Sequence, residues 1–315
     1  MTTKRWVAGI IAVGVCLSCS VNAWAHESDA RHRHLSGTVP PLFENIRVTW
    51  YQDILYDDSS ADTSFTSLDI YTPEPSEQGS PVLVYVHGGG FSRGDKADPK
   101  DLDPKPGFFT HELGFLFVSI NYRLLPEGRY PTNAQDVANA LAWVHAHIGE
   151  YSGDPDQIFL MGFDVGAVLI GQVATDESFL NNAGGELGLV KGVILIEGAG
   201  YDLTQRSPEG LEGFFGPDPE VWTRASSITH VARGKNIPPF LFLHVGAGAS
   251  LGGVNSRQQS EEMAEALRAA EIRAETVPLW DKEHYGANEA IGEPGEAATI
   301  AVRKFLESLS DSPHQ

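Results

Sequence analysis

The fold of this chain is decided by the stretch Met161-Gly162-Phe163-Asp164-Val165-Gly166-Ala167. An apolar run, Gln157–Leu160, precedes it and is typical of a short buried strand. The run Ala167–Ala174 follows it and indicates a helix packed on a sheet. Because glycine has no Cβ, the two glycines that flank Asp164 allow the strand to turn abruptly into the helix. Asp164 is therefore predicted to stand at the tip of this turn with a positive φ.

Asp164 has two interpretations at this tip. Aspartate is a favourable N-cap and its charge suits a helix N-terminus, so Asp164 can simply cap the helix that follows. A carboxylate can also act as a nucleophile that forms a covalent ester. The sequence leaves the structural and the chemical role open.

Residues 1–25 are predicted to be a secretory signal peptide. Two basic residues precede the apolar run Trp6–Val21, and Ala23-Trp24-Ala25 provides a small-residue cleavage site. A membrane anchor is the alternative, but the run is short for a bilayer span. We expect export, to the periplasm or beyond, with residues 26–44 forming a linker.

Composition limits the partners of the mature chain. Both cysteines, Cys16 and Cys19, lie in the predicted signal peptide, so we expect no disulfide and no cysteine-based metal site after cleavage. The formal net charge of −20 argues against nucleic acid or anionic membranes as partners. A small-molecule substrate or ligand is expected, with no metal or organic cofactor implied and no further membrane span. The sequence does not determine the oligomeric state.

Residues 45–312 are predicted to form a single α/β domain. Buried apolar runs alternate with helical segments, which is typical of a mostly parallel central sheet with helices on both faces. Residues 201–234 lack clear periodicity and are a candidate lid region. We expect strands at Val48–Tyr56, Ser67–Tyr71, Val82–Val86, Phe115–Ile120, Gln157–Leu160, Val190–Ile196, Phe240–Val245 and Ala274–Leu279, and helices at Pro131–Tyr151, Ala167–Ala174, Gln258–Ala270 and Ala297–Leu309.

Several motifs occur together in one chain order. The strand, Gly-x-Asp-x-Gly and helix have the layout of a nucleophile elbow. The other segments are Leu68–Pro73, His87-Gly88-Gly89-Gly90-Phe91, Asn121–Leu124, Asp154–Asp156 and His284. With these motifs the sequence resembles the α/β-hydrolase superfamily, in its carboxylesterase-like branch, over nearly all of the mature chain.

The resemblance implies a role for each matched position. Gly89 and Gly90 would supply backbone N–H groups to an oxyanion hole, with the N–H of Val165 as the third donor. His284 follows the last strand, where the family keeps its general base. A plain glycine-rich turn and a lone surface histidine are the alternatives for these segments.

Two positions depart from the family pattern. The elbow carries Asp164 in place of the serine, so the usual Ser-His-Asp triad is incomplete. The segment 246–253, where the orienting acid belongs, contains no carboxylate, and the next one is Glu261 inside a predicted helix. Ser250 lies in a Gly-x-Ser-x-Gly match within this segment, but no helix follows at once, so it is not expected to be a nucleophile.

Glu197 is a candidate for the missing acid, because it ends the strand that follows the elbow helix. In part this is similar to haloalkane dehalogenases, where an elbow aspartate attacks, a histidine activates water and a carboxylate after this strand orients the histidine. Asp164, His284 and Glu197 could form such a set. Those enzymes follow the nucleophile with tryptophan, whereas this chain has Val165. A carboxylate at 164 could also occupy the oxyanion hole itself and compete with substrate.

Two functions remain open at this point. The first is a hydrolase of the carboxylesterase-like class that acts on small ester-type substrates with Asp164 at the nucleophile position. The second is a catalytically impaired or inactive homologue, a pseudoenzyme that retains a binding pocket. A purely structural protein has no positive signal in the sequence.

Overall fold

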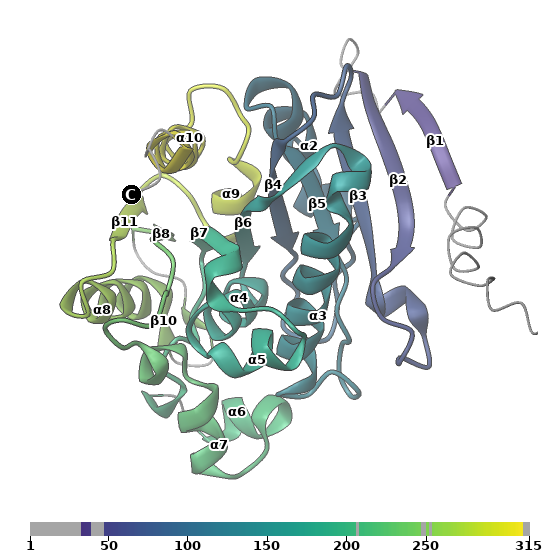
Figure 1. Ribbon diagram of the computed structural model, residues 1–315. Coiled ribbons are helices and arrows are strands. Elements are labelled where there is room, and N and C mark those ends of the chain that lie inside the picture. Colours follow the sequence, from purple (N-terminus) through teal and green to yellow (C-terminus); the bar gives the residue numbers. More distant parts are fainter. Residues whose placement is uncertain (1–32, 39–46, 206–207, 247–249, 252–253, 311–315) are drawn as a thin grey trace, which may run out of the picture. The chain divides into compact units, whose positions relative to one another are not determined.

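A nine-stranded sheet forms the centre of the computed structural model, which describes residues 33–38, 47–205, 208–246, 250–251 and 254–310. The strand order is β1-β2-β3-β5-β4-β6-β7-β8-β11 (Figure 1). The strands are β1 (Arg33–Thr38), β2 (Arg47–Leu55), β3 (Ser67–Pro73), β4 (Ser80–Val86), β5 (Leu116–Ile120), β6 (Gly153–Phe163), β7 (Val190–Ile196), β8 (Phe240–Val245) and β11 (Ala274–Leu279). Two further short strands, β9 (Ser250–Leu251) and β10 (Val254–Asn255), pair with each other.

The sheet is parallel from β5 to β11 and antiparallel from β1 to β5. In the parallel part, Val86 of β4 lies opposite Gly162 of β6, and Phe163 lies opposite Ile196 of β7. Parallel strands bring their carboxyl ends to one edge of a sheet. The segments that follow β4, β6 and β7 are therefore neighbours, although they are far apart in the sequence.

Helices cover both faces of the sheet, and β4 shows why its sequence is continuously apolar. Val82, Val84 and Val86 point into one core, while Leu83 and Tyr85 point into the other. A strand that is buried on both faces needs apolar side chains at successive positions instead of alternate ones. The predicted mostly parallel α/β sheet with helices on both faces is thereby confirmed.

The helices divide between the two cores. The first core includes buried residues of α3, α4, α5 and α8, and the second includes those of α9 and α10. The helices are α1 (Pro99–Leu102), α2 (Lys105–Gly107), α3 (Thr132–His147), α4 (Val165–Thr175), α5 (Glu177–Asn182), α6 (Pro208–Phe215), α7 (Pro219–Ala225), α8 (Ser256–Ala269), α9 (His284–Glu289) and α10 (Ala297–Ser310).

Residues 33–38 correct part of the predicted linker over residues 26–44. They form β1 and pair antiparallel with β2, with Arg33 opposite Gln52 and Thr38 opposite Arg47. Pairing at a sheet edge is made by backbone groups, so it requires no alternating side-chain pattern. For this reason the polar sequence gave no strand signal.

Residues 201–234 contain two helices, α6 and α7, where the sequence shows no clear periodicity. These helices have only eight and seven residues, too few to repeat an apolar spacing. The start of α7 is nevertheless encoded locally, because the Asp218 side chain accepts a hydrogen bond from the N–H of Glu220 and Pro219 begins the helix.

The predicted signal peptide, residues 1–25, lies outside the described residues. The structure therefore leaves export as a prediction. Within the ranges that the structure describes, no helix combines the length and apolar character needed to span a bilayer.

The elbow glycines are fixed by close backbone contacts. A Cβ on Gly166 would lie 2.2 Å from the carbonyl oxygen of Val86, so β4 and the first turn of α4 can approach only without a side chain there.

We predict that Gly166→Ala lowers the free energy of unfolding by about 1–3 kcal/mol, the usual cost of overpacking. Urea denaturation measures this. Gly149→Ala is the control, because a Cβ there meets nothing within 4 Å. Equal midpoints for the two variants would contradict the packing argument.

Candidate active site

The turn between β6 and α4 has the predicted elbow geometry. Asp164 joins Phe163, the last residue of β6, to Val165, the first of α4, and has φ 52° and ψ −119°. A Cβ on Gly162 would lie 2.7 Å from the carbonyl carbon of Gly166, so neither flanking glycine has room for a side chain. The sharp turn thus places the side chain of residue 164 at the carboxyl edge of the sheet.

The Asp164 side chain does not cap α4, which corrects the helix-cap interpretation. An N-cap residue needs an extended backbone so that its side chain can reach the free N–H groups of the first turn. With φ 52°, Asp164 instead directs its carboxylate toward the loop after β4. There Oδ2 accepts hydrogen bonds from the N–H groups of Gly89 (3.0 Å) and Gly90 (3.1 Å).

His284 faces the other oxygen of Asp164. Its Nε2 lies 3.8 Å from Oδ1, which is an ion-pair distance and too long for a direct hydrogen bond. His284 is the first residue of α9. Its ring packs against the rings of Phe163 and Tyr285, with centroid distances of 4.8 and 5.3 Å, and these two rings also contact each other. The imidazole is thus one of a cluster of three rings, with Nε2 directed at the elbow.

Glu197 occupies the position of an orienting acid. It follows β7 with φ 52° and is fully buried. Its Oε2 lies 3.2 Å from Nδ1 of His284, while Oε1 accepts from the N–H of Val245 (2.5 Å) and from Oγ of Ser256 (3.1 Å). A buried carboxylate requires such partners to offset its loss of hydration. The structure brings together the predicted set of Asp164, His284 and Glu197.

Ser256 is a site residue that sequence reasoning missed. It is the first residue of α8 and its hydroxyl donates to both oxygens of Glu197, at 3.1 and 3.3 Å. The sequence signal is weak, because a serine at a helix start is common for reasons of capping alone. Only the three-dimensional position of Glu197 shows its role.

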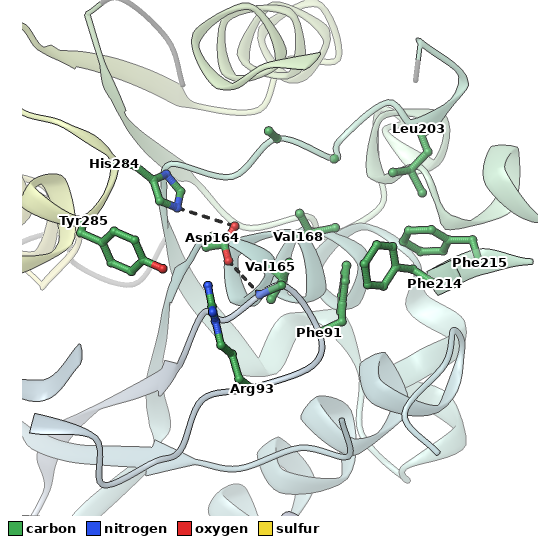
Figure 2. Close-up of a pocket in the computed structure, with 13 residues that line it drawn as sticks. Phe91, Arg93, Asp164, Val165, Val168, Leu203, Phe214, Phe215, His284 and Tyr285 are labelled. Atoms are coloured by element: carbon green, nitrogen blue, oxygen red, sulfur yellow. Dashed lines mark hydrogen bonds and ion pairs between the residues drawn. The ribbon is translucent and has the colours of Figure 1, made fainter. Parts of the chain in front are cut away.

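A cavity of about 390 Å³ opens above the elbow (Figure 2). One wall is apolar, with Phe91 after β4 and Phe214 and Phe215 of α6, and the Phe91 ring centroid lies 5.0 Å from that of Phe214 and 5.9 Å from that of Phe215. The opposite side is polar. Figure 2 shows the Arg93 side chain and the Tyr285 hydroxyl directed toward Asp164. The remaining lining residues are Gly90, Val165, Val168, Ala199, Gly200, Leu203 and His284.

The candidate lid region contributes part of this wall. Leu203, Phe214 and Phe215 all come from residues 201–234 and line the cavity. Movement of the region stays a prediction. The sequence gave no indication of which aromatic residues of this segment face the site, because the segment has no repeating pattern.

The side chain of His87 supports the glycine loop after β4. Its Nδ1 lies 2.7 Å from the carbonyl oxygen of Gly88, and its ring stacks on Tyr122 with centroids 4.5 Å apart. The Tyr122 hydroxyl donates to the carbonyl of His87 at 3.0 Å. Burial lowers the pKa of His87, so the ring is neutral at neutral pH and can donate through Nδ1.

Comparison with known proteins identifies the family of the chain. A family model described as BD-FAE matches residues 68–267, more than half of the chain. The chain belongs to the BD-FAE family. The matched range contains the glycine loop, the elbow and Glu197, and it ends before His284.

Curated relatives of this BD-FAE chain are named as ester hydrolases. The probable carboxylic ester hydrolase LipM of Mycobacterium tuberculosis is 30% identical over 253 residues, which cover 75% of this chain and 56% of LipM. The probable isoprenylcysteine α-carbonyl methylesterase ICMEL2 of Arabidopsis thaliana is 29% identical over 238 residues, covering 69% of this chain and 54% of the relative. The chain thus spans about half the length of the curated relatives it matches.

Solved esterase structures share the fold of the BD-FAE chain. Esterase B from Lactobacillus rhamnosis superposes with a TM-score of 0.66 at 19% identity, covering 84% of this chain and 86% of that one. Est2 from Thermogutta terrifontis, with butyrate bound, gives 0.61 at 21% identity, covering 86% and 94%. The predicted carboxylesterase-like α/β-hydrolase fold is confirmed.

A second, polar cavity of about 670 Å³ lies on the other side of the glycine loop. Arg93 and Tyr285 line both cavities. Its other lining residues are Gly88, Gly89, Gly94, Asp98, Lys100, Asp101, Phe163 and Glu289. In the part of the chain that the structure describes, no group of three or more histidine, cysteine or acidic residues is arranged to hold a metal ion.

Lys105 is buried close to this polar cavity. Its Nζ donates to the carbonyl oxygen of Asp101 at 2.6 Å and lies 5.6 Å from the centroid of the Tyr85 ring. Burial lowers the pKa of Lys105 to about 7, and the negative charge of Asp101 opposes part of this shift. The folded protein therefore disfavours the charged ammonium at this position.

The lowered pKa of Lys105 predicts a pH-dependent stability. Above pH 7 Lys105 loses its proton in the folded chain, whereas in the unfolded chain it stays protonated up to the ordinary lysine pKa. The free energy of unfolding therefore rises with pH, by up to ~1.4 kcal/mol per pH unit. Lys105→Met removes this contribution. Urea denaturation of both proteins should show that the stability of Lys105→Met relative to wild type falls between pH 7 and 9. Lys100→Met, at an exposed lysine, is the control, and a pH-independent difference for Lys105→Met would refute the argument.

Proposed function

We propose that this chain is a hydrolase of small ester-type substrates in which Asp164 is the nucleophile, His284 the general base and Glu197 the acid that orients His284. The observation that carries the proposal is the unequal environment of the two Asp164 oxygens. Oδ2 is held by the N–H groups of Gly89 and Gly90, whereas Oδ1 faces His284 and the cavity. One oxygen is thus anchored while the other is placed to attack.

Asp164 and the substrate react first. Oδ1 forms a bond to the electrophilic carbon of the substrate, and the leaving group departs with the electron pair of the bond that breaks. The covalent intermediate is an acyl or alkyl derivative of Asp164. No proton has to leave the nucleophile, because the carboxylate already carries the reacting electron pair.

Water then cleaves the intermediate. Nε2 of His284 takes a proton from the water as its oxygen attacks Cγ of Asp164, and the negative charge that develops falls on Oδ2. Oδ2 already accepts two backbone hydrogen bonds, so the donors are aimed at the atom where charge appears. The bond from Cγ to Oδ1 breaks and the departing group takes the proton from His284. The carboxyl group formed on Asp164 releases the second proton of the water to solvent, which restores the carboxylate.

Glu197 acts on this step through His284. Its contact with Nδ1 favours the tautomer in which Nε2 can accept a proton, and it stabilises the imidazolium that forms. The fixed hydrogen bonds from Val245 and Ser256 keep this carboxylate in place. The acid therefore comes from the end of β7, and the segment after β8 needs no carboxylate.

The second candidate function is an impaired homologue that retains the binding pocket. The same hydrogen bonds favour it, because Oδ2 occupies the donors that would otherwise receive the carbonyl oxygen of an ester. In this case the wild-type protein binds small esters without hydrolysing them.

A labelling experiment tests the covalent route. Turnover of benzyl acetate in ¹⁸O-water, followed by peptide mass spectrometry, should place ¹⁸O in the peptide that contains Asp164, because water attacks Cγ. His284→Gln is the control and should lose the label together with turnover. An unlabelled Asp164 peptide after turnover would rule out the covalent route.

A substitution at the elbow separates the two candidate functions. Asp164→Ser frees the Gly89 and Gly90 donors and gives His284 an alcohol to activate, so we expect hydrolysis of p-nitrophenyl acetate to increase about 100-fold or more, the usual worth of an oxyanion donor. Asp164→Asn, which keeps the acceptor but has no nucleophilic carboxylate, is the matched control and should be inactive. A wild type that hydrolyses neither p-nitrophenyl acetate nor benzyl acetate, beside an active Asp164→Ser, would favour the impaired homologue. A folded but inactive Asp164→Ser would contradict the proposed roles of His284 and Glu197.

A further inference from the structure

The structure assigns a particular bond to the reaction. We propose that Asp164 attacks the saturated alkyl carbon of the ester alcohol, so that the alkyl carbon–oxygen bond breaks and a carboxylate leaves toward Arg93 and Tyr285. This inference rests on the proposed nucleophilic role of Asp164 and adds the position of attack. Esters of primary, unhindered alcohols with an adjacent aromatic ring are the substrate class that fits.

Attack at the ester carbonyl lacks free donors in this site. In that reaction the negative charge develops on the carbonyl oxygen of the substrate, which must then be stabilised by hydrogen bonds. The N–H groups of Gly89 and Gly90 are directed at Oδ2 of Asp164, at 3.0 and 3.1 Å. To use them, the substrate would have to displace a charged acceptor that is covalently part of the elbow. Of the three predicted donors, the N–H of Val165 alone then remains to bind the carbonyl oxygen of the substrate.

Attack at a saturated carbon does not require those donors. In a displacement the charge moves from Oδ1 to the leaving oxygen, and no tetrahedral oxyanion forms on the substrate. Oδ2 can keep both hydrogen bonds through the alkylation and receive the oxyanion charge in the later hydrolysis. The N–H groups of Gly89 and Gly90 therefore bind Oδ2 of Asp164 in every step of the reaction, as they do in the structure.

Arg93 and Tyr285 are placed to receive the leaving carboxylate. Both line the cavity beside Asp164, and Figure 2 shows the guanidinium and the phenol hydroxyl directed toward it. Among the described residues, no acidic group forms an ion pair with Arg93. Guanidinium groups match the geometry of carboxylates, and the phenol can donate a further hydrogen bond. Both residues also line the polar cavity.

The apolar wall defines the alcohol part of the substrate. Phe91, Phe214 and Phe215 form an aromatic surface on the side of the cavity away from Arg93. An aromatic ring attached to the attacked carbon would pack on this surface, and it would also accelerate displacement at that carbon. Benzyl acetate is the simplest ester with both properties, and its leaving group is acetate.

The step balances without a further reactant. Oδ1 forms a bond to the benzylic carbon while the bond from that carbon to the acetate oxygen breaks, and acetate departs with the electron pair. Water, deprotonated by His284, attacks Cγ of Asp164 and the bond from Cγ to Oδ1 breaks. Benzyl alcohol leaves with Oδ1 and the proton from His284. The carboxyl group formed on Asp164 releases the second proton of the water to solvent, which restores the carboxylate. The water oxygen stays in Asp164 and is transferred to the alcohol in the next turnover.

Product labelling decides the position of attack. Wild-type protein is given benzyl acetate in ¹⁸O-water for many turnovers, and both products are analysed by mass spectrometry. Alkyl cleavage puts ¹⁸O into benzyl alcohol, whereas attack at the carbonyl puts it into acetate. Label in acetate alone overturns this inference but leaves the proposed function intact if Asp164 is also labelled. Absence of label from Asp164, or absence of turnover, overturns both.

Two variants give an independent readout. His284→Gln should accumulate a benzyl ester on Asp164, detectable by peptide mass spectrometry, because alkylation needs no base while hydrolysis does. Arg93→Gln should slow the alkylation step about tenfold, in keeping with the loss of a charged donor to a leaving group. Arg129→Gln, at an exposed arginine outside both cavities, is the control and should leave the rate unchanged. An acetylated Asp164, or equal rates for Arg93→Gln and wild type, contradicts the inference.

Discussion

The hydrogen bonds from the N–H groups of Gly89 and Gly90 to Oδ2 of Asp164 determine how the whole site is organised. They exist because β4 and β6 are parallel neighbours in register, with Val86 opposite Gly162, so that the loop after one strand meets the turn after the other. In enzymes with such a loop, the N–H donors usually bind an oxygen of the substrate. Here they hold a carboxylate of the protein, which anchors one oxygen and leaves the other facing the imidazole of His284.

The position of the acid is the second constraint, and it follows from burial. Glu197 is fully buried at the end of β7 and is stable there because Val245, Ser256 and His284 all contact its oxygens. Such a carboxylate would be costly without these partners. Its positive φ shows that the backbone adapts to direct the side chain toward the edge of the sheet. In the proposed mechanism the glycine-rich segment after β8 therefore needs no carboxylate.

Much of this could be predicted from the sequence, because it depends on local patterns. Apolar runs located the central strands, and the resemblance to α/β-hydrolases placed Asp164, Glu197 and His284 in one predicted set. What the sequence could not show depends on long-range geometry. The direction of the Asp164 carboxylate required the register of β4 and β6, and the role of Ser256 required the place of Glu197. The short helix α6 and the edge strand β1 have no side-chain pattern long enough to detect.

Arg93 and Tyr285 form a wall that the apolar and the polar cavity share. A molecule that occupies one cavity and draws either side chain toward itself also changes the shape and charge of the other cavity. By thermodynamic linkage the effect is reciprocal: the occupant of the second cavity alters the affinity of the first by the same factor. The two compartments are thus expected to fill with either positive or negative cooperativity, and the sign depends on whether their occupants compete for the same guanidinium or share it.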